Sequence, residues 1–127
     1  MTEAIKEGTL LWEPSDAFKQ QTNLAKYMEW LKEHKQLSFD RYEDLWKWSV
    51  TELEAFWASL WEYFSVQSST PYRRVLADRT MPGARWFEGT RLNYAEHVFR
   101  QARPDVPAMI SLSELRPLQE MSWQTLR

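Results

Sequence analysis

The stretch Met81-Pro82-Gly83-Ala84-Arg85-Trp86-Phe87-Glu88-Gly89-Thr90-Arg91-Leu92-Asn93-Tyr94-Ala95-Glu96 carries two of the three glycines of this 127-residue chain. Met81-Pro82-Gly83 is a turn signal, since proline fixes its own backbone torsion and glycine tolerates conformations that other residues avoid. Asn93 is a good N-cap, and the spacing of the apolar residues after it predicts a helix that continues to about Ala102. The stretch therefore predicts a constrained loop that enters a helix.

On either side of this stretch the pattern changes. Residues 67–91, which overlap the start of this stretch, predict a long irregular connection. Such a connection is unusual in a compact domain unless it is functional or packed on another element. Downstream, Pro107–Leu112 predicts a strand and Leu118–Met121 a weaker second strand. Ser122 then predicts the N-cap of a short helix.

The first half of the chain is expected to be helical. Apolar side chains at helical spacing predict one helix over Asp16–Lys35 with Ser15 as its N-cap. A shorter helix, with Asp40 as its N-cap, is expected to run to Trp48. Thr51 and Glu54 match the capping box of a third helix, whose apolar residues run to Phe64 and from which Ser59 is expected to face away. We therefore expect a mainly α chain of about four helices with a short C-terminal β-hairpin.

Composition narrows the class of protein. The chain has 43% hydrophobic residues, eight Trp and no cysteine, which excludes disulfides and thiolate zinc sites and is typical of a cytoplasmic globular protein. Its apolar runs are too short to span a membrane. Residues 71–103 hold seven Arg and three acidic residues. They are expected to form salt bridges, or alternatively to face an anionic ligand, whereas the net charge of −2 argues against nucleic acid.

The residues that could carry chemistry are few. Three glycines are too few for a glycine-rich phosphate loop. His34 and His97 have no second metal-ligand residue at a suitable spacing and are interpreted as solvated or packing residues. Ser111 and Ser113 lack the surroundings of a nucleophile. The acidic cluster near Asp40 is typical of a helix start, so neither a catalytic residue nor a metal site is predicted.

Four blocks occur in the order found in acetoacetyl-CoA synthetases, within the acyl-CoA synthetase (adenylate-forming) superfamily, and the chain resembles the N-terminal segment of these enzymes. The blocks are Leu11-Trp12-Glu13-Pro14-Ser15, Leu45-Trp46-Lys47-Trp48-Ser49-Val50 with Phe56-Trp57, Met81–Phe87 continuing to Glu96, and Pro107-Ala108-Met109-Ile110 with Glu114 and Ser122-Trp123. The third block is the most specific. Two residues depart from the family pattern there. Glu88 stands where proline is expected, and His97, directly after Glu96, stands where asparagine is expected.

The resemblance implies an acid–thiol ligase that joins acetoacetate to coenzyme A by way of an acyl-adenylate, releasing AMP and pyrophosphate. ATP, Mg²⁺ and coenzyme A (CoA) would be cofactors of the full-length enzyme, and its catalytic motifs lie downstream of Arg127 in the family. Residues 1–103 would then be the helical N-terminal cap region and residues 104–127 the truncated start of the AMP-binding domain, inactive alone. Arg85 and Arg91 are the candidates for contacts to CoA phosphates.

The remainder of the same enzyme is the partner that this reading implies. A homodimer through exposed aromatic faces or the C-terminal strands is a second expectation, and neither a membrane nor nucleic acid is expected as a partner. The alternative is a free-standing helical protein-interaction module, which the surplus of aromatic residues favours.

Overall fold

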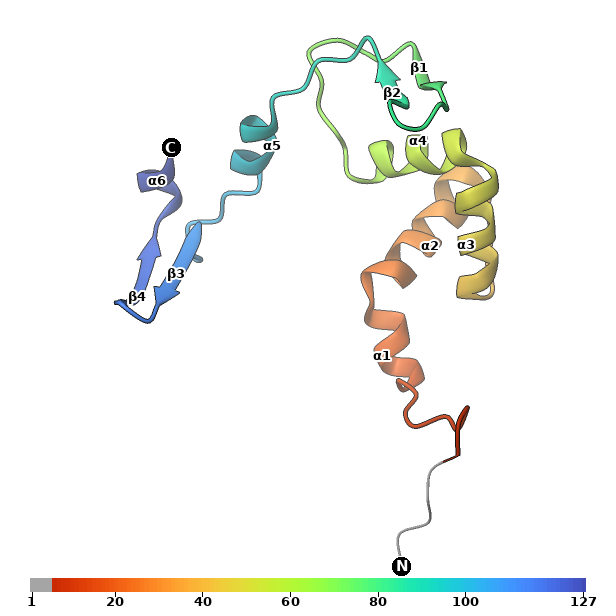
Figure 1. Ribbon diagram of the computed structural model, residues 1–127, viewed down its shortest axis with the longest axis horizontal. Coiled ribbons are helices and arrows are strands. Elements are labelled where there is room, and N and C mark those ends of the chain that lie inside the picture. The colour runs from red at the N-terminus through yellow and green to blue at the C-terminus, as the bar shows by residue number, and fades with distance from the viewer. Residues whose placement is uncertain (1–5) are drawn as a thin grey trace, which may run out of the picture. The chain divides into compact units, whose positions relative to one another are not determined.

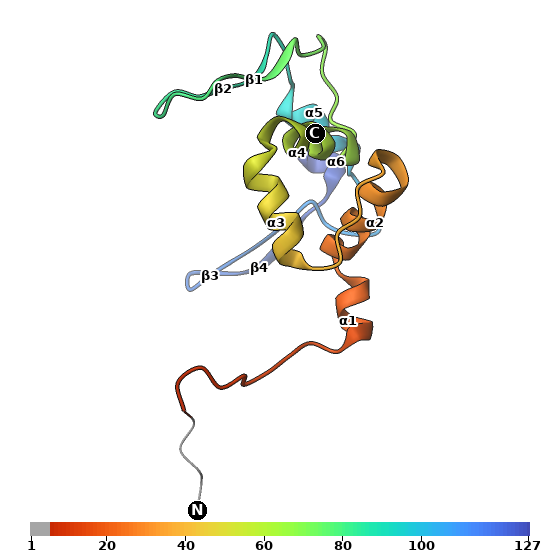
Figure 2. The same ribbon diagram turned by 90° about the vertical axis from the view of Figure 1, so that its right-hand side faces the viewer.

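The computed structural model describes residues 6–127. The chain divides into two compact units, with the boundary between Tyr63 and Phe64. The first unit contains four helices, namely α1 (Asp16–Gln21), α2 (Asn23–Lys35), α3 (Tyr42–Thr51) and α4 (Leu53–Tyr63). Helices α2, α3 and α4 pack together, and α1 continues outward from α2 (Figures 1 and 2). The mainly helical class with a C-terminal hairpin is confirmed.

The single helix expected over Asp16–Lys35 is wrong, because the chain breaks at Thr22. Thr22 has an extended backbone with ψ of 154°, and its hydroxyl accepts a hydrogen bond from the backbone N–H of Ala25. Threonine is a better helix cap than helix interior, since its side chain competes for backbone hydrogen bonds. The same residue thus ends α1 and starts α2. Ser15 caps α1 as predicted.

The capping box expected at Thr51 is also wrong. Thr51 is the last residue of α3, and its hydroxyl donates to the carbonyl oxygens of Lys47 and Trp48 instead of capping α4. Helix α3 begins one residue after Arg41, and no side chain caps it there, so Asp40 does not have the predicted role. Tertiary packing, not local capping, sets these two boundaries.

The core of the first unit lies where α2, α3 and α4 meet. Tyr27, Leu31 and Leu45 are its buried apolar residues. Contrary to expectation, Ser59 of α4 faces this core and is only 2% exposed. Its hydroxyl donates to the carbonyl oxygen of Phe56 at 2.6 Å, and the Tyr27 hydroxyl lies 2.5 Å from its oxygen. Ser59 is therefore buried because two polar partners satisfy it.

Replacing Tyr27 by phenylalanine is expected to lower the free energy of unfolding by about 1 kcal/mol, the usual net value of one hydrogen bond. The cost stays small because Ser59 keeps its bond to Phe56. Burial also raises the pKa of the Tyr27 phenol. The parent chain should therefore lose stability as the pH rises above about 10, and the variant should lose less.

Denaturant unfolding at pH 7 and at alkaline pH measures both effects. Tyr42, which is 59% exposed, is the matched control, and Tyr42→Phe should leave the free energy of unfolding nearly unchanged. Equal losses in the two variants would show that the Tyr27–Ser59 bond contributes nothing.

The second unit contains two hairpins and two helices. Strands β1 (Arg74–Asp78) and β2 (Arg85–Glu88) pair antiparallel and are followed by α5 (Tyr94–Arg100). Strands β3 (Met109–Ser113) and β4 (Arg116–Met121) form the second hairpin and lead into α6 (Trp123–Leu126). The side chains of Asn93 and Ser122 cap α5 and α6, as predicted.

The connection at residues 67–91 is not irregular throughout, which corrects the expectation. It contains the β1–β2 hairpin, with Val75 and Leu76 buried, and an additional bridge joins Thr70 to Arg91. The sequence signal was weak because arginines and an aspartate stand at the ends of β1, and strand propensity depends strongly on context. The expected domain boundary after residue 103 stays a prediction.

No helix in residues 6–127 has the length and apolar character needed to cross a bilayer.

Candidate functional site

The first candidate site residue, Arg85, lies at the turn end of the β1–β2 hairpin. It pairs with Asp78 across the ladder, and its guanidinium lies 3.5 Å from the carboxylate of Glu88. The backbone N–H of Thr80 donates to Asp78 Oδ1 at 2.9 Å, which lowers the pKa of that carboxyl. The positive charge of Arg85 contributes in the same direction. Arg85 is thus an exposed cation with two acidic neighbours.

The second candidate, Arg91, lies at the other end of the same hairpin. Its carbonyl oxygen accepts hydrogen bonds from the backbone N–H and the hydroxyl of Ser69. Within residues 6–127, no ion pair or hydrogen bond engages its guanidinium. Arg85 lies opposite Asp78 near the turn of the hairpin, whereas Arg91 is bridged to Thr70 beyond its open end. The structure therefore places the two arginines at opposite ends of the hairpin.

The segment that supports Arg91 is held by hydrogen bonds on both sides. The Thr70 hydroxyl donates to the carbonyl oxygen of Gly89 at 3.0 Å, and the Thr90 hydroxyl donates to the carbonyl oxygen of Thr70 at 2.9 Å. Gly89 has a φ of +87°, and a Cβ there would lie 3.2 Å from Arg73 Nε. Gly89 thus allows both the left-handed turn and the close approach of Arg73.

Two side chains of α5 hold the start of the second unit, and sequence reasoning missed both roles. His97 Nε2 lies 2.7 Å from the backbone nitrogen of Gln67 and 2.9 Å from its carbonyl oxygen, so it accepts or donates according to its tautomer. Arg100 Nη1 donates to the carbonyl oxygen of Ser65 at 3.0 Å. The partners are backbone atoms 30 and 35 residues away, which no local sequence signal identifies.

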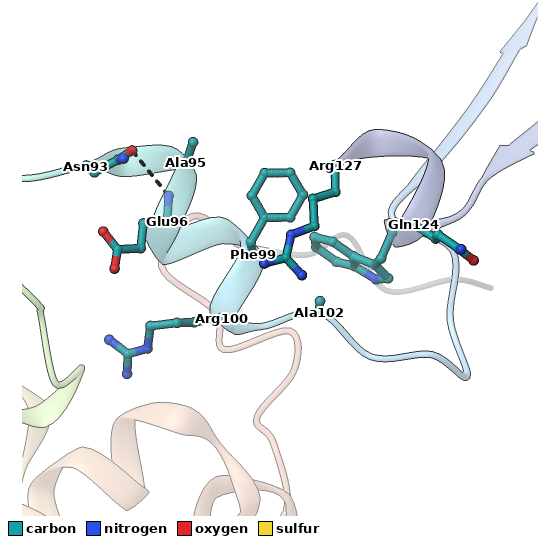
Figure 3. Close-up of a pocket in the computed structure, with 9 residues that line it drawn as sticks. Asn93, Ala95, Glu96, Phe99, Arg100, Ala102, Gln124 and Arg127 are labelled. Carbon is teal, nitrogen blue, oxygen red and sulfur yellow. Dashed lines mark hydrogen bonds between the residues drawn. The ribbon is translucent and has the colours of Figure 1, made fainter.

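A pocket of about 630 Å³ lies between α5 and α6 (Figure 3). Phe99 of α5 and Trp123 of α6 form an edge-to-face aromatic pair with ring centres 6.3 Å apart. Asn93, Glu96, Arg100, Gln124 and Arg127 supply its polar lining. Trp123 Nε1 is buried, and no acceptor in the described part of the chain lies within hydrogen-bonding distance of it. This pocket size falls in the range of small-molecule sites.

The remaining candidates from the sequence show only structural contacts. His34 stacks on Trp30 with ring centres 4.9 Å apart, and its Nδ1 lies 3.0 Å from the Trp30 carbonyl oxygen. Asp44, in the acidic cluster, pairs with Arg41. Across residues 6–127 there is no group of three His, Cys, Asp or Glu side chains that could hold a metal ion.

Comparison with known proteins gives these features a context. Residues 42–98 match the family model described as acetyl-coenzyme A synthetase N-terminus. An acetoacetyl-CoA synthetase from Danio rerio is 31% identical over 117 residues, which cover 91% of this chain and 17% of the relative. A malonamoyl-CoA synthetase from Penicillium aethiopicum is 34% identical over 97 residues, covering 71% of this chain and 13% of that protein.

A solved structure agrees with these relatives. The acetoacetyl-CoA synthetase from Streptomyces lividans superposes with a TM-score of 0.81 at 44% identity, over 90% of this chain and 18% of that chain. The chain therefore belongs to the acyl-CoA synthetase class and matches the N-terminal segment of these enzymes. Over almost its whole length it corresponds to the N-terminal segment of an acetoacetyl-CoA synthetase. It spans less than a fifth of the length of these relatives.

Proposed function

We propose that the chain serves as the N-terminal segment of an acetoacetate–CoA ligase, in cytoplasmic lipid or ketone-body metabolism. The complete enzyme would convert ATP, acetoacetate and CoA into acetoacetyl-CoA, AMP and pyrophosphate. The observation that carries the proposal is the shared fold, with 44% identity, over 90% of the chain. ATP and Mg²⁺ would bind to the remainder of the enzyme, which holds the catalytic groups, and the present residues would support that remainder.

A chimera tests this proposal. This chain replaces the matched segment of the Streptomyces lividans enzyme, and the release of AMP is measured with ATP, acetoacetate and CoA. Because the segment is proposed to support the catalytic part and not to perform the reaction, the chimera should keep ligase activity, and deletion of the segment should abolish it. The chain alone should show no turnover. A folded chimera without activity, or turnover by the chain alone, would contradict the proposal.

Contact with CoA phosphates is a separate part of the proposal. Arg91 is the stronger candidate, because Arg85 already has Glu88 and Asp78 as neighbours. In titration calorimetry of the active chimera with CoA, Arg91→Ala is expected to weaken binding by about tenfold, as for the loss of one charge-assisted hydrogen bond. Arg85→Ala should have a smaller effect. Unchanged affinity in the Arg91 variant would exclude this contact.

A specific observation also favours the interaction module as a second candidate function. Tyr42, Trp46 and Val50 recur every four residues along α3 and are 59%, 54% and 47% exposed. Leu45 and Trp48 lie beside this stripe and face the core, so the apolar side of α3 is wider than the part that the core covers, as is typical of a helix covered by another surface. Sedimentation of the chain alone tests the homodimer that this surface or the β3–β4 hairpin would form. A monomer at high concentration would exclude it.

A further inference from the structure

The C-terminal hairpin of the second unit exposes several large apolar side chains. Every residue of β3 and β4 is exposed, including Ile110, Leu112 and Leu118. Leu115, in the turn between the strands, is 95% exposed. A two-stranded hairpin is only marginally stable in water unless a further strand or a helix covers one face. We therefore expect another element to cover the β3–β4 hairpin.

The pocket between α5 and α6 gives a more specific indication of what covers it. Trp123 Nε1 is the one buried side-chain donor or acceptor in residues 6–127 that has no hydrogen-bonding partner. A buried donor without an acceptor destabilises the fold, so folded proteins normally supply an acceptor. Two arginines and one glutamate line the pocket, so its charge also favours an electron-rich group. The missing group is thus an oxygen acceptor.

We propose that the pocket between α5 and α6 docks a segment from the remainder of the ligase, and that this segment places a carbonyl or carboxylate oxygen on Trp123 Nε1. The inference rests on the proposed function. The remainder of the enzyme is the occupant favoured by the Streptomyces lividans structure, in which the matched segment is 18% of the chain. The same docking segment would cover the apolar face of the β3–β4 hairpin.

Replacement of Trp123 by phenylalanine, in the chain alone and in the chimera, tests the proposal. Phenylalanine keeps an aromatic ring against Phe99 and removes the N–H. In the chain alone the substitution removes an unsatisfied donor, so the midpoint of unfolding should stay equal or rise. In the chimera it leaves the docked oxygen without its donor, so the midpoint should fall. A role in packing alone would lower both midpoints, which would overturn the proposal.

Hydrogen exchange of the indole N–H gives a second measurement that does not depend on stability. With ¹⁵N-labelled tryptophan, the signal missing from the Trp123→Phe spectrum identifies Trp123 among the eight indoles. Its exchange should be at least about tenfold slower in the chimera than in the chain alone, because an acceptor protects the proton. Trp12, which is 72% exposed, is the matched control in both proteins.

The outcomes separate this inference from the proposed function. An active chimera whose Trp123 proton exchanges as fast as in the chain alone overturns the inference and leaves the proposed function standing. A folded but inactive chimera contradicts the proposed function. Protection that rises with the concentration of the chain alone identifies a second copy as the occupant and overturns the inference. If the first chimera does not fold, one that exchanges only residues 64–127 repeats the test with the second unit alone.

Discussion

Replacing Leu31 by alanine is expected to lower the free energy of unfolding by about 2–5 kcal/mol, a large share of the stability of a small domain. Leu31 has no exposed surface and lies at the centre of the core formed by α2, α3 and α4. Removing its side-chain carbons loses their transfer free energy and leaves a cavity that aromatic neighbours such as Trp48 and Phe56 cannot fill without moving.

Leu11 provides the matched control, because the same substitution there removes a side chain that is 73% exposed. Leu11→Ala should change the free energy of unfolding by less than about 0.5 kcal/mol, as is usual for surface substitutions. Denaturant unfolding followed by tryptophan fluorescence measures both variants. Similar losses at the two positions would show that the first unit does not have the core described above.

Replacing Gly89 by valine is the second large effect, with an expected loss of at least about 2 kcal/mol. The φ of +87° is unfavourable for any side chain and most of all for a β-branched one. The new Cβ would also meet Arg73 Nε at 3.2 Å. Since the Gly89 carbonyl oxygen accepts from Thr70, a shift at this position would also disturb the backbone that carries Arg91.

Gly83 separates the two causes. Its φ of +108° is also unfavourable for a side chain, but nothing lies within 4 Å of the Cβ that would be added there. Gly83→Val should therefore lose only the conformational part, and Gly89→Val should lose more. The unfolding midpoint and the amide signals of Thr70 and Thr90 report the difference. Equal losses would mean that the contact with Arg73 contributes nothing.

Local features of the structure could be predicted because neighbouring residues determine them. Ser15, Asn93 and Ser122 cap helices as their side chains predict, since each accepts a hydrogen bond from an N–H three residues ahead. The C-terminal hairpin was predicted from short apolar runs separated by a turn. Thr51 shows the limit of this reasoning, because its capping signal was correct for an isolated segment and α3 still continued through it.

The candidate site could be predicted only in part. Arg85 and Arg91 could be singled out by residue type, but their separation at opposite ends of a hairpin depends on strand pairing. His97 and Arg100 gave no signal, because they bind backbone atoms that every residue possesses. The buried Trp123 Nε1 without a hydrogen-bonding partner could not be predicted either, because composition does not show which side-chain atoms are buried.

Residue order and short spacings were enough to predict the helical character of the first half, the caps at Ser15, Asn93 and Ser122, and the family resemblance of the stretch from Met81 to Glu96. Three features could be seen only in the folded structure: the pairing of β1 with β2, the burial of Ser59 beside Tyr27, and the hydrogen bond between His97 and Gln67. The last two contacts join residues 32 and 30 positions apart. Each contact lies within one unit, and it forms only when that unit folds and its packing compensates for the entropy of closing a long loop.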